Sequence, residues 1–348
     1  MRCKRLLNPR PNTNAMIKLS ILQLISLLVT VTGFSQKVEL LVAHEKTSFR
    51  GLSVVNNNVV WVSGNNGQVG KTIDGGKTWE WFKVAGFSKT DFRDIEAFDK
   101  NNAIIMGIDT PAILLKTSNG GKDWKVVYKN NSPGMFLDAM AFWNIRSGIV
   151  IGDPIEGKFF VARTFDGGDN WQDIPVDKRP IAAEGEACFA SSGTNIQKLT
   201  KAETIFVSGG KESNVFIRYR KIALPMVKGL ESTGANSVAV KNKKEFMVVG
   251  GDFTKKDSSN GNCVATIDGG LNFTKPVTPP HGYRSCIIYL KDKTWITCGL
   301  SGVDFSKDDG KNFELISTES FHAVQKAKKG NAVYFSGTAG KIGKLVAE

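Results

Sequence analysis

The sequence is poor in the residues that proteins use to hold metals and redox cofactors. It has three histidines, His44, His281 and His322, and five cysteines. Their spacing matches no zinc, haem or iron–sulfur motif. No G-x-G-x-x-G run leads from a predicted strand into a helix, so no dinucleotide site of that kind is indicated. We therefore expect no metal and no bound cofactor, and nothing supports an oxidoreductase.

The sequence also lacks a segment suited to nucleic acid. Its net charge of +13 falls to +8 without residues 1–35, because these hold five basic residues and no acidic ones. The remaining basic residues are spread over many turns, and no basic run carries interleaved aromatic residues. We predict no nucleic-acid binding, although the positive charge permits an acidic protein or an acidic glycan as a partner.

Long apolar runs are absent except at the N-terminus. Residues 1–35 combine basic residues with the apolar run Leu19–Val31, which is too short to span a bilayer with margin. Small residues, Gly33 and Ser35, precede Gln36 in the manner of a cleavage site. This pattern predicts a signal peptide over residues 1–35 and a secreted or periplasmic protein with no membrane span after its removal. An uncleaved membrane anchor is the alternative.

Four cysteines follow the predicted signal peptide: Cys188, Cys263, Cys286 and Cys298. We favour buried free thiols for all four. The alternative for an oxidising compartment is a bridge between Cys286 and Cys298 on neighbouring strands.

An eight-residue turn pattern recurs five times. Its copies are Thr72-Ile-Asp74-Gly-Gly76-Lys-Thr-Trp79, Thr117-Ser-Asn119-Gly-Gly121-Lys-Asp-Trp124, Thr164-Phe-Asp166-Gly-Gly168-Asp-Asn-Trp171, Thr266-Ile-Asp268-Gly-Gly270-Leu-Asn-Phe273 and Ser306-Lys-Asp308-Asp-Gly310-Lys-Asn-Phe313. The Asp or Asn side chain can accept hydrogen bonds from the backbone of its own turn, and the second glycine supplies a positive φ. Each copy is therefore a self-capped hairpin turn. Its Asp or Asn is structural, rather than a calcium ligand or a catalytic group.

This pattern resembles the Asp-box, also called the bacterial neuraminidase (BNR) repeat, of sialidases and several other propellers. In those families the box is a folding device remote from the active site, and the same is implied here. Asn119 departs from the pattern but can make most of the same hydrogen bonds.

Two further marks extend the repeat to seven units. A glycine ends an apolar strand once per unit, at Gly64, Gly107, Gly152, Gly209, Gly250, Gly299 and Gly337. Similar openings precede the strands, namely Ser48-Phe49-Arg50, Asp91-Phe92-Arg93, Met135-Phe136-Leu137, Gly282-Tyr283-Arg284 and Ser320-Phe321-His322. Units four and five open more weakly, near Glu186 and Asn236. The units are about 38 to 57 residues long, which is the length of a propeller blade.

We therefore predict an all-β fold, a seven-bladed β-propeller with four-stranded antiparallel blades over residues 36–348. The last unit lacks a fourth strand, whereas residues 38–42 supply a spare one ahead of the first unit. The N-terminal strand is then expected to complete the last blade and close the ring. The two-domain alternative is disfavoured.

One face of such a propeller should hold the candidate binding site. The strand openings line the axial channel there and place Arg50, Arg93, Leu137, Glu186, Asn236, Arg284 and His322 around its mouth. Three arginines in this ring would form a forked site for a carboxylate or phosphate. We predict ligand binding through Arg50, Arg93, Arg284, Glu186 and His322. The alternative is that the arginines pair with neighbouring carboxylates and merely cap the channel.

The overall pattern resembles the photosystem II stability and assembly factor-like proteins, a family of seven-bladed Asp-box propellers. The resemblance covers nearly all of the chain after the signal peptide. It implies a non-enzymatic assembly scaffold that binds protein. Together with the predicted export, this leads us to expect an envelope or extracellular protein as partner, and we expect a monomer.

A sialidase-like glycoside hydrolase is the alternative function. It would cast Tyr283 as nucleophile, Glu186 as its base and Asp153 as acid/base. However, Tyr283 takes the place of Phe49 and Phe92 in the repeat, so packing alone accounts for its ring. Sialidase propellers also have six blades, which favours the binding protein.

Overall fold

The computed structural model describes residues 36–44, 47–218 and 220–347. The predicted signal peptide, residues 1–35, lies outside the described residues. The elements of the described part are strands and two short 3-10 turns, η1 (Val176–Lys178) and η2 (Thr338–Gly340). No helix in the described ranges has the length and apolar composition needed to cross a membrane.

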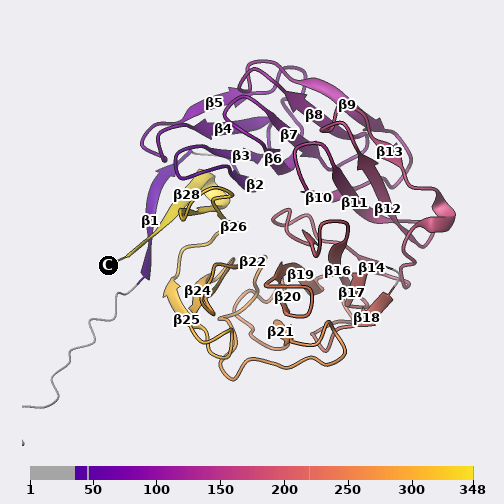
Figure 1. The fold of residues 1–348 in the computed structure, drawn as a ribbon, viewed down its shortest axis with the longest axis vertical. Coiled ribbons are helices and arrows are strands. Elements are labelled where there is room, and N and C mark those ends of the chain that lie inside the picture. Colours follow the sequence, from indigo (N-terminus) through magenta and orange to yellow (C-terminus); the bar gives the residue numbers. More distant parts are fainter. Residues whose placement is uncertain (1–35, 45–46, 219, 348) are drawn as a thin grey trace, which may run out of the picture. The chain divides into compact units, whose positions relative to one another are not determined.

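Seven blades follow one another along the chain and around a common axis (Figure 1). Blade 1 holds β2 (Phe49–Val54), β3 (Val60–Gly64), β4 (Gln68–Thr72) and β5 (Glu80–Lys83). Blade 2 holds β6 (Phe92–Ala97), β7 (Ala103–Gly107), β8 (Ala112–Thr117) and β9 (Lys125–Asn130). Blade 3 holds β10 (Leu137–Phe142), β11 (Gly148–Ile155), β12 (Lys158–Thr164) and β13 (Gln172–Asp173).

The remaining blades vary this plan. Blade 4 holds β14 (Glu186–Ala187), β15 (Ile196–Lys198), β16 (Thr204–Gly210), β17 (Asn214–Ile217) and β18 (Arg220–Ala223). Blade 5 holds β19 (Thr233–Val240), β20 (Phe246–Asp252) and β21 (Cys263–Thr266), with a bridge from Ala265 to Thr274 at its outer edge. Blade 6 holds β22 (Cys286–Tyr289), β23 (Trp295–Gly299), β24 (Gly302–Ser306) and β25 (Glu314–Ser317). Blade 7 holds β26 (Ala323–Lys326), β27 (Val333–Ser336), β28 (Lys341–Ala347) and β1 (Gln36–Ala43).

The N-terminal strand completes the last blade, as predicted. The strand order of blade 7 is β1-β28-β27-β26, so the first strand of the chain covers the edge of the last. Leu41 and Val42 of β1 pack with Phe49 and Tyr334, which come from opposite ends of the chain. The predicted seven-bladed fold with a closed ring is therefore confirmed.

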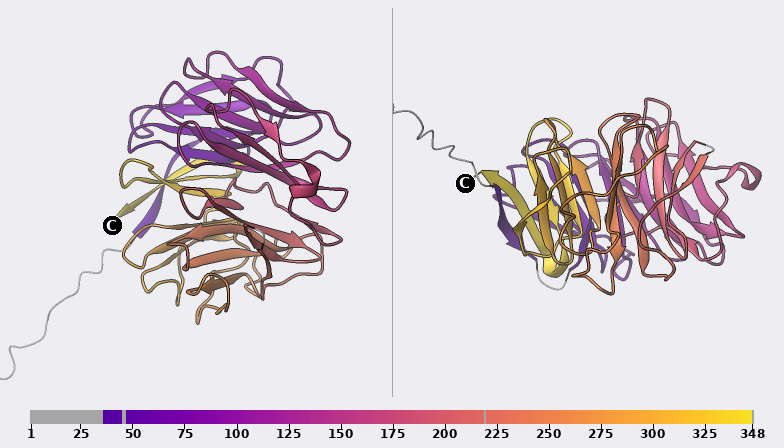
Figure 2. Two further views of the ribbon diagram at one scale, coloured as in Figure 1. Left: turned by 45° about the vertical axis from the view of Figure 1, so that its right-hand side comes forward. Right: turned by 90° about the horizontal axis from the view of Figure 1, so that it is seen from below.

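The second strands of blades 1, 2 and 5 are buried along their whole length. Every residue of β3, β7 and β20 is buried, because both faces of each sheet pack against neighbouring blades (Figure 2). The apolar clusters accordingly combine residues of two adjacent blades, as in the cluster that joins Trp61 of blade 1 to Ile105 of blade 2. Such packing holds the first strands rigidly around the axis.

The Asp-box turns form the hydrogen bonds that their sequence predicts. In the first box, Thr72 Oγ1 donates to Asp74 Oδ1 at 2.8 Å, and Thr78 N donates to the same oxygen at 3.0 Å. Asn119 Oδ1 accepts from Asp123 N at 3.0 Å in the same way. Equivalent bonds surround the other three box aspartates, Asp166, Asp268 and Asp308.

The boxes also define the two faces of the propeller. Gly75 N of the first box donates to Asn58 O in the turn between β2 and β3, so both turns lie on one face, the box face. The first strands begin on the opposite face, the mouth face.

Candidate functional site: a charged cluster at the axis

A β-bulge recurs at the start of the first strand. In blades 1 and 2 the register shifts between Phe49 and Gly51 and between Phe92 and Asp94, which leaves Arg50 and Arg93 without a Cα partner. A bulge adds one residue and redirects its side chain. The extra residues, the bulge residues below, are Arg50, Arg93, Asp138 and Asn236 in blades 1, 2, 3 and 5. By the same alignment they are Ser285 and His322 in blades 6 and 7.

This register corrects two positions of the predicted ring. The strand-end glycine faces the residue before the bulge, as Gly64 faces Phe49 and Gly299 faces Arg284. By the same comparison Leu137 faces Gly152. Arg284 and Leu137 therefore occupy the core position of Phe49, one residue before the ring. Phe136 and Tyr283 each lie one residue before the position of the repeat phenylalanine. Aligning them with that phenylalanine by sequence therefore displaces their blades by one residue.

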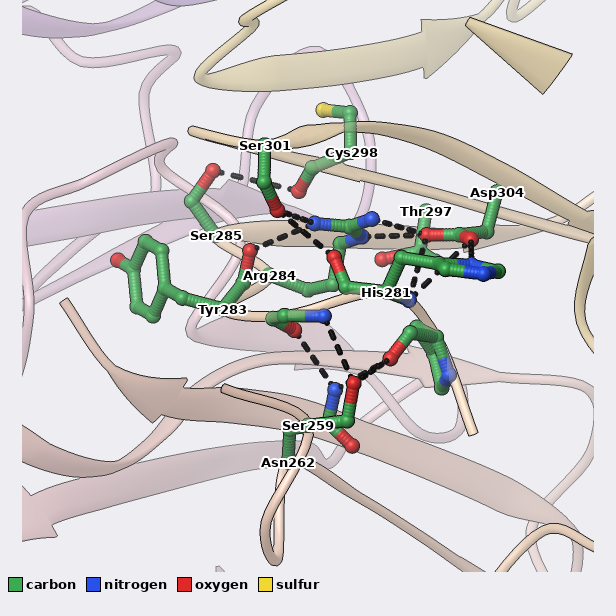
Figure 3. Close-up of polar contacts among 12 residues, drawn as sticks. Ser259, Asn262, His281, Tyr283, Arg284, Ser285, Thr297, Cys298, Ser301 and Asp304 are labelled. Atoms are coloured by element: carbon green, nitrogen blue, oxygen red, sulfur yellow. Dashed lines mark hydrogen bonds and ion pairs between the residues drawn. The ribbon is translucent and has the colours of Figure 1, made fainter. Parts of the chain in front are cut away.

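Arg284 consequently lies inside blade 6 and not at the mouth, and Figure 3 shows its contacts with Asp304, Ser301 and Tyr283. Its side chain is 0% exposed. Its Nε donates to Asp304 Oδ2 at 2.6 Å, and its Nη1 donates to Tyr283 O and Ser301 Oγ at 2.9 Å each. The buried carboxylate of Asp304 compensates the charge, so this guanidinium is a structural group.

His281 extends this buried pair to the surface. Its Nδ1 lies 2.6 Å from Asp304 Oδ1, and its backbone N donates to the same carboxylate. The side chain is about half exposed. Asp304 thus orients an imidazole that the sequence pattern did not single out.

Arg50 and Arg93 form the cationic part of the axial cluster, and His322 lies beside them. Burial and then the charge of Arg93 lower the pKa of Arg50. Burial, Arg50 and Arg93 together lower the pKa of His322 to about 3, so His322 is neutral over the physiological range. Its Nε2 lies 3.0 Å from Ser48 Oγ. The three side chains therefore lie close enough for the charges of the two arginines to act on each other and on the imidazole.

The two arginines differ in their partners. Arg93 Nε donates to Asp91 Oδ2 at 2.8 Å. Within the described part of the chain, Arg50 has no ion pair, and its recorded hydrogen bond runs from Nη1 to Ser191 O at 3.4 Å. Arg50 is only partly exposed. A half-buried guanidinium with one long bond to a carbonyl retains donors for an anionic ligand.

Ser191 belongs to a segment that lies across the axis. Blade 4 has no single bulge residue; instead residues 188–195, the plug loop, separate β14 from β15 at the same register point. The loop contacts the first strands of blades that do not adjoin blade 4. Arg50 of blade 1 reaches Ser191, and Ser192 Oγ donates to Ser285 O of blade 6 at 2.8 Å. Only a segment at the centre of the ring can touch both.

Further contacts fix the plug loop. Ser191 Oγ donates to Asn236 Oδ1 at 3.0 Å, and Thr194 Oγ1 lies 2.7 Å from Ser237 Oγ. A Cβ on Gly193 would stand 2.3 Å from Asp94 Oδ1. The plug loop therefore occupies the axis, and the region of the mouth face around Arg50 and Arg93 beside it is called the basin below.

Asp94 has a buried carboxyl group next to the plug loop. Its oxygens accept from Ile95 N at 2.8 Å and from Met140 N at 2.7 Å in the next blade. Burial raises its pKa to about 7 despite these bonds. Asp94 therefore links blades 2 and 3 and supports Gly193.

Glu186 anchors the start of the plug loop. Its Oε1 accepts from Ser208 Oγ and from Asn214 Nδ2, the latter at 2.8 Å. Its Oε2 accepts from Ala183 N at 2.7 Å and from Lys221 Nζ at 2.5 Å. The side chain is fully buried, so these partners occupy the oxygens that we expected to face a ligand.

The residues of the glycosidase alternative do not assemble into a nucleophile and base. Tyr283 OH donates to Asn236 Oδ1 at 2.7 Å, and burial raises the pKa of Tyr283 to about 12. No hydrogen bond recorded among the described residues joins Tyr283 to Glu186. Asp153 Oδ1 accepts from Cys188 N at 2.9 Å, and burial raises its pKa to about 6.

Asp138 is the acidic bulge residue beside Arg93. Both of its carboxylate oxygens are buried and have no hydrogen-bond partner among the described residues. Burial and then Asp153 raise its pKa well above its usual value, which favours the neutral acid. Asp153 itself lines a 610 Å³ pocket between blades 3 and 4. The cationic part of the cluster therefore lies on blades 1 and 2.

Two parts of the site escaped prediction from the sequence. Asp304 carried a signal, because a lone acidic residue within the apolar strand β24 requires a buried cation. The plug loop carried a weaker signal, the run of small polar residues Ser191-Ser192-Gly193-Thr194-Asn195. This run lies in blade 4, whose opening motif matches the repeat only weakly.

Comparison with known proteins supports the resemblance. The family model of the photosynthesis system II assembly factor YCF48 matches residues 34–142, which span β1 to β10. No curated protein sequence matches the chain.

The fold is shared with several solved propellers. A structure of YCF48 bound to D1 peptide has a TM-score of 0.62 at 16% identity, covering 90% of this chain and 95% of that one. YCF48 from Cyanidioschyzon merolae has a TM-score of 0.66 at 15% identity, covering 88% of this chain and 98% of its own. The WD40 propeller of Doa1 has a TM-score of 0.61 at 13% identity, covering 89% and 97%. The chain is thus a propeller similar to the YCF48 assembly factors, as its repeat pattern indicated.

Proposed function

We propose that this protein is an exported, non-catalytic propeller that binds an acidic protein segment on its mouth face. The observation that carries the proposal is Arg50, a half-buried guanidinium without a carboxylate partner in the described ranges, beside Arg93. The candidate site thus contains two arginines instead of the three expected from the sequence. A carboxylate that entered the basin would displace little, because Arg50 has only a long bond to a carbonyl to give up.

An aromatic group beside the basin suggests a second feature of the ligand. Phe253, which is exposed, packs edge-on against Phe189 of the plug loop and against Tyr283. Exposed aromatic surface next to a charged site favours a partner with an apolar side chain near its acidic group. The structure of YCF48 bound to D1 peptide supports a peptide ligand for a propeller of this fold.

A displayed library of random peptides, selected on the purified chain, tests this proposal. We expect enrichment of segments with Asp or Glu next to an apolar residue, and loss of the enrichment with the Arg50→Gln/Arg93→Gln variant. The Lys77→Gln/Lys311→Gln variant changes the net charge equally on the box face and should select like the wild type. Selection of acidic peptides by the double arginine variant would contradict the proposal.

Export rests on residues 1–35, and a separate measurement addresses it. N-terminal sequencing of the protein from its native cells should find Gln36 as the first residue, in a periplasmic or extracellular fraction. A chain that keeps residues 1–35 would contradict cleavage and favour the anchored alternative.

A further inference from the structure

Cys286 and Cys298 face each other in the core of blade 6. They are direct partners in the antiparallel register of β22 and β23, and both are fully buried free thiols. Each thiol is also among the groups that shift the pKa of the other. Directly opposed residues of antiparallel strands have Cα atoms about 4.5–5.5 Å apart, within the range of about 4.4–6.8 Å that a disulfide spans.

The Cys286 thiol also belongs to the contacts between blades. In blade 5 the residue after the bulge, Ser237, accepts from Ile287 N of the next blade at 3.1 Å. Cys286 holds the same position in blade 6, and its Sγ accepts from Val324 N of blade 7 at 3.4 Å. It also accepts from Thr194 Oγ1 of the plug loop at 3.5 Å. The Cys286 thiol therefore connects blade 6 both to blade 7 and to the plug loop.

The environments of the two thiols differ. Burial alone would raise the pKa of Cys286, but hydrogen bonds from Cys298 and Thr194 bring it below the usual value. Burial and the adjacent Cys286 raise the pKa of Cys298 well above its usual value. Cys286 is therefore the better nucleophile of the pair, and Cys298 is placed to attack it in turn.

We propose that Cys286 and Cys298 form a redox-active dithiol that closes to a disulfide and thereby loosens the plug loop. The oxidant is a low-molecular-weight or protein disulfide, which reaches the pair when blade 6 opens, because both thiols are fully buried in the closed fold. The Cys286 thiolate attacks one sulfur of this disulfide, which forms a mixed disulfide and releases the first thiol. Cys298 then gives up its proton and attacks Cys286 Sγ, which releases the second thiol. Two electrons and two protons pass from the cysteine pair to the oxidant.

Formation of the disulfide changes the hydrogen bonds that hold the plug loop. The Cys286 S–H donates to Val324 O at 3.3 Å, and this bond disappears with the proton. The new bond, about 2.05 Å long, also draws Cys286 Sγ towards Cys298, which weakens the bonds that this sulfur accepts from Thr194 and Val324. The loop should then open more often, together with the basin that Arg50 lines.

The other two described cysteines provide internal controls. Cys188 lies in the plug loop and donates to Val207 O at 3.6 Å, whereas Cys263 pairs with Val249 in the register of β21. Neither has another cysteine as its strand partner in the described ranges.

Refolding of the full chain in glutathione buffers tests the disulfide, because the unfolded chain gives the oxidant access to both thiols. Cys3→Ser removes the thiol outside the described residues. After alkylation and non-reducing tryptic digestion, we expect residues 285–291 linked to residues 294–307, with Cys188 and Cys263 alkylated. Alkylation of Cys286 and Cys298 to the same extent as the other two would overturn the proposal, as would linkage to Cys188 or Cys263.

Hydrogen exchange of the reduced and oxidised protein tests the coupling to the plug loop. Exchange within residues 188–195 should accelerate by about tenfold on oxidation. The comparison uses one folded chain in two redox states, so it does not depend on how a variant folds. Cys298→Ser, which cannot close the bond, should show no change in the same two buffers. Equal exchange of the wild-type loop in both states would overturn the coupling.

Discussion

Arg50 and Arg284 show how one residue type takes two roles in neighbouring positions of a repeat. Arg284 precedes the bulge and is buried against Asp304, whereas Arg50 is the bulge residue and, among the described residues, hydrogen-bonds to a single carbonyl. A fully buried charge requires compensation within the fold, whereas a partly exposed one can remain available for a ligand. The position relative to the bulge therefore separates a structural arginine from a binding arginine.

Loss of the buried partner should destabilise the protein strongly. Asp304→Ala leaves the Arg284 guanidinium uncompensated in the core and should lower the free energy of unfolding by about 3–5 kcal/mol. Asp91→Ala removes the partly exposed partner of Arg93 and should cost less than about 1 kcal/mol. Urea denaturation of both variants measures the difference. Equal losses would show that Arg284 is not held by this pair.

The buried carboxyl of Asp94 should make stability depend on pH. An unfolded Asp ionises near pH 3.8, but burial raises the pKa of Asp94 to about 7 in the folded state. The unfolded chain therefore releases this proton first, and stability falls as pH rises from about 4 to about 7. Asp94→Asn should shrink the loss of urea stability between about pH 5 and about pH 8. An unchanged loss would contradict the raised pKa.

The Asp-box carboxyls should act in the opposite direction. A hydrogen bond from the Thr78 side chain, joined by that of its backbone, lowers the pKa of Asp74 to about 2. This stabilisation is complete above pH 3.8 and is lost as pH falls toward 2. Asp74→Asn should flatten the acid limb of a plot of melting temperature against pH, because Asn119 already closes such a turn without a titrating group. An acid limb identical to that of the wild type would contradict this role.

At the scale of single elements, the sequence predicted the strands better than their register. The strand-end glycines and apolar runs located β3, β7 and β23 because burial on both faces demands such residues. The bulge could not be placed from pattern alone. An aromatic residue sits one position early in blades 3 and 6, and this shifts Leu137 and Arg284 into the predicted ring.

The plug loop escaped prediction for a different physical reason. It replaces one bulge residue with a whole loop, so it breaks the alternation from which strands are recognised. Its small polar residues are typical of exposed turns, yet they are buried at the axis by contacts from distant blades. Contacts of that kind depend on ring closure and leave no local trace in the sequence.

Gly193 provides a test of the plug loop as a packed element. Its φ is +68°, and an added Cβ would stand 2.3 Å from Asp94 Oδ1. Gly193→Ala should cost about 1–2 kcal/mol from backbone strain and about 1–3 kcal/mol more from the clash. Gly157→Ala is the matched control, because its φ is +74° and nothing lies within 4 Å of the added Cβ. Equal unfolding free energies for the two variants would contradict the packing of the loop.

At the scale of the whole molecule, the N-terminal strand closes the ring. Its removal would expose the edge of β28 and the apolar residues beneath Leu41 and Val42. A chain that starts at Gln36 should keep the melting temperature of the full chain, whereas one that starts at His44 should melt earlier and aggregate. Thermal melts with light scattering measure both. An unchanged melt without β1 would contradict closure by this strand.

Binding of an acidic segment at the basin is the central claim, and the dissociation constant of a labelled acidic peptide tests it most directly. Fluorescence anisotropy compares the wild type with Arg50→Gln/Arg93→Gln and with Lys77→Gln/Lys311→Gln. We predict that the arginine variant binds at least about tenfold more weakly, because each lost charge-assisted hydrogen bond is worth about 1.5–3 kcal/mol. The lysine variant should bind like the wild type. Equal affinity of the arginine variant, or equal weakening by both, would contradict a binding site at Arg50 and Arg93.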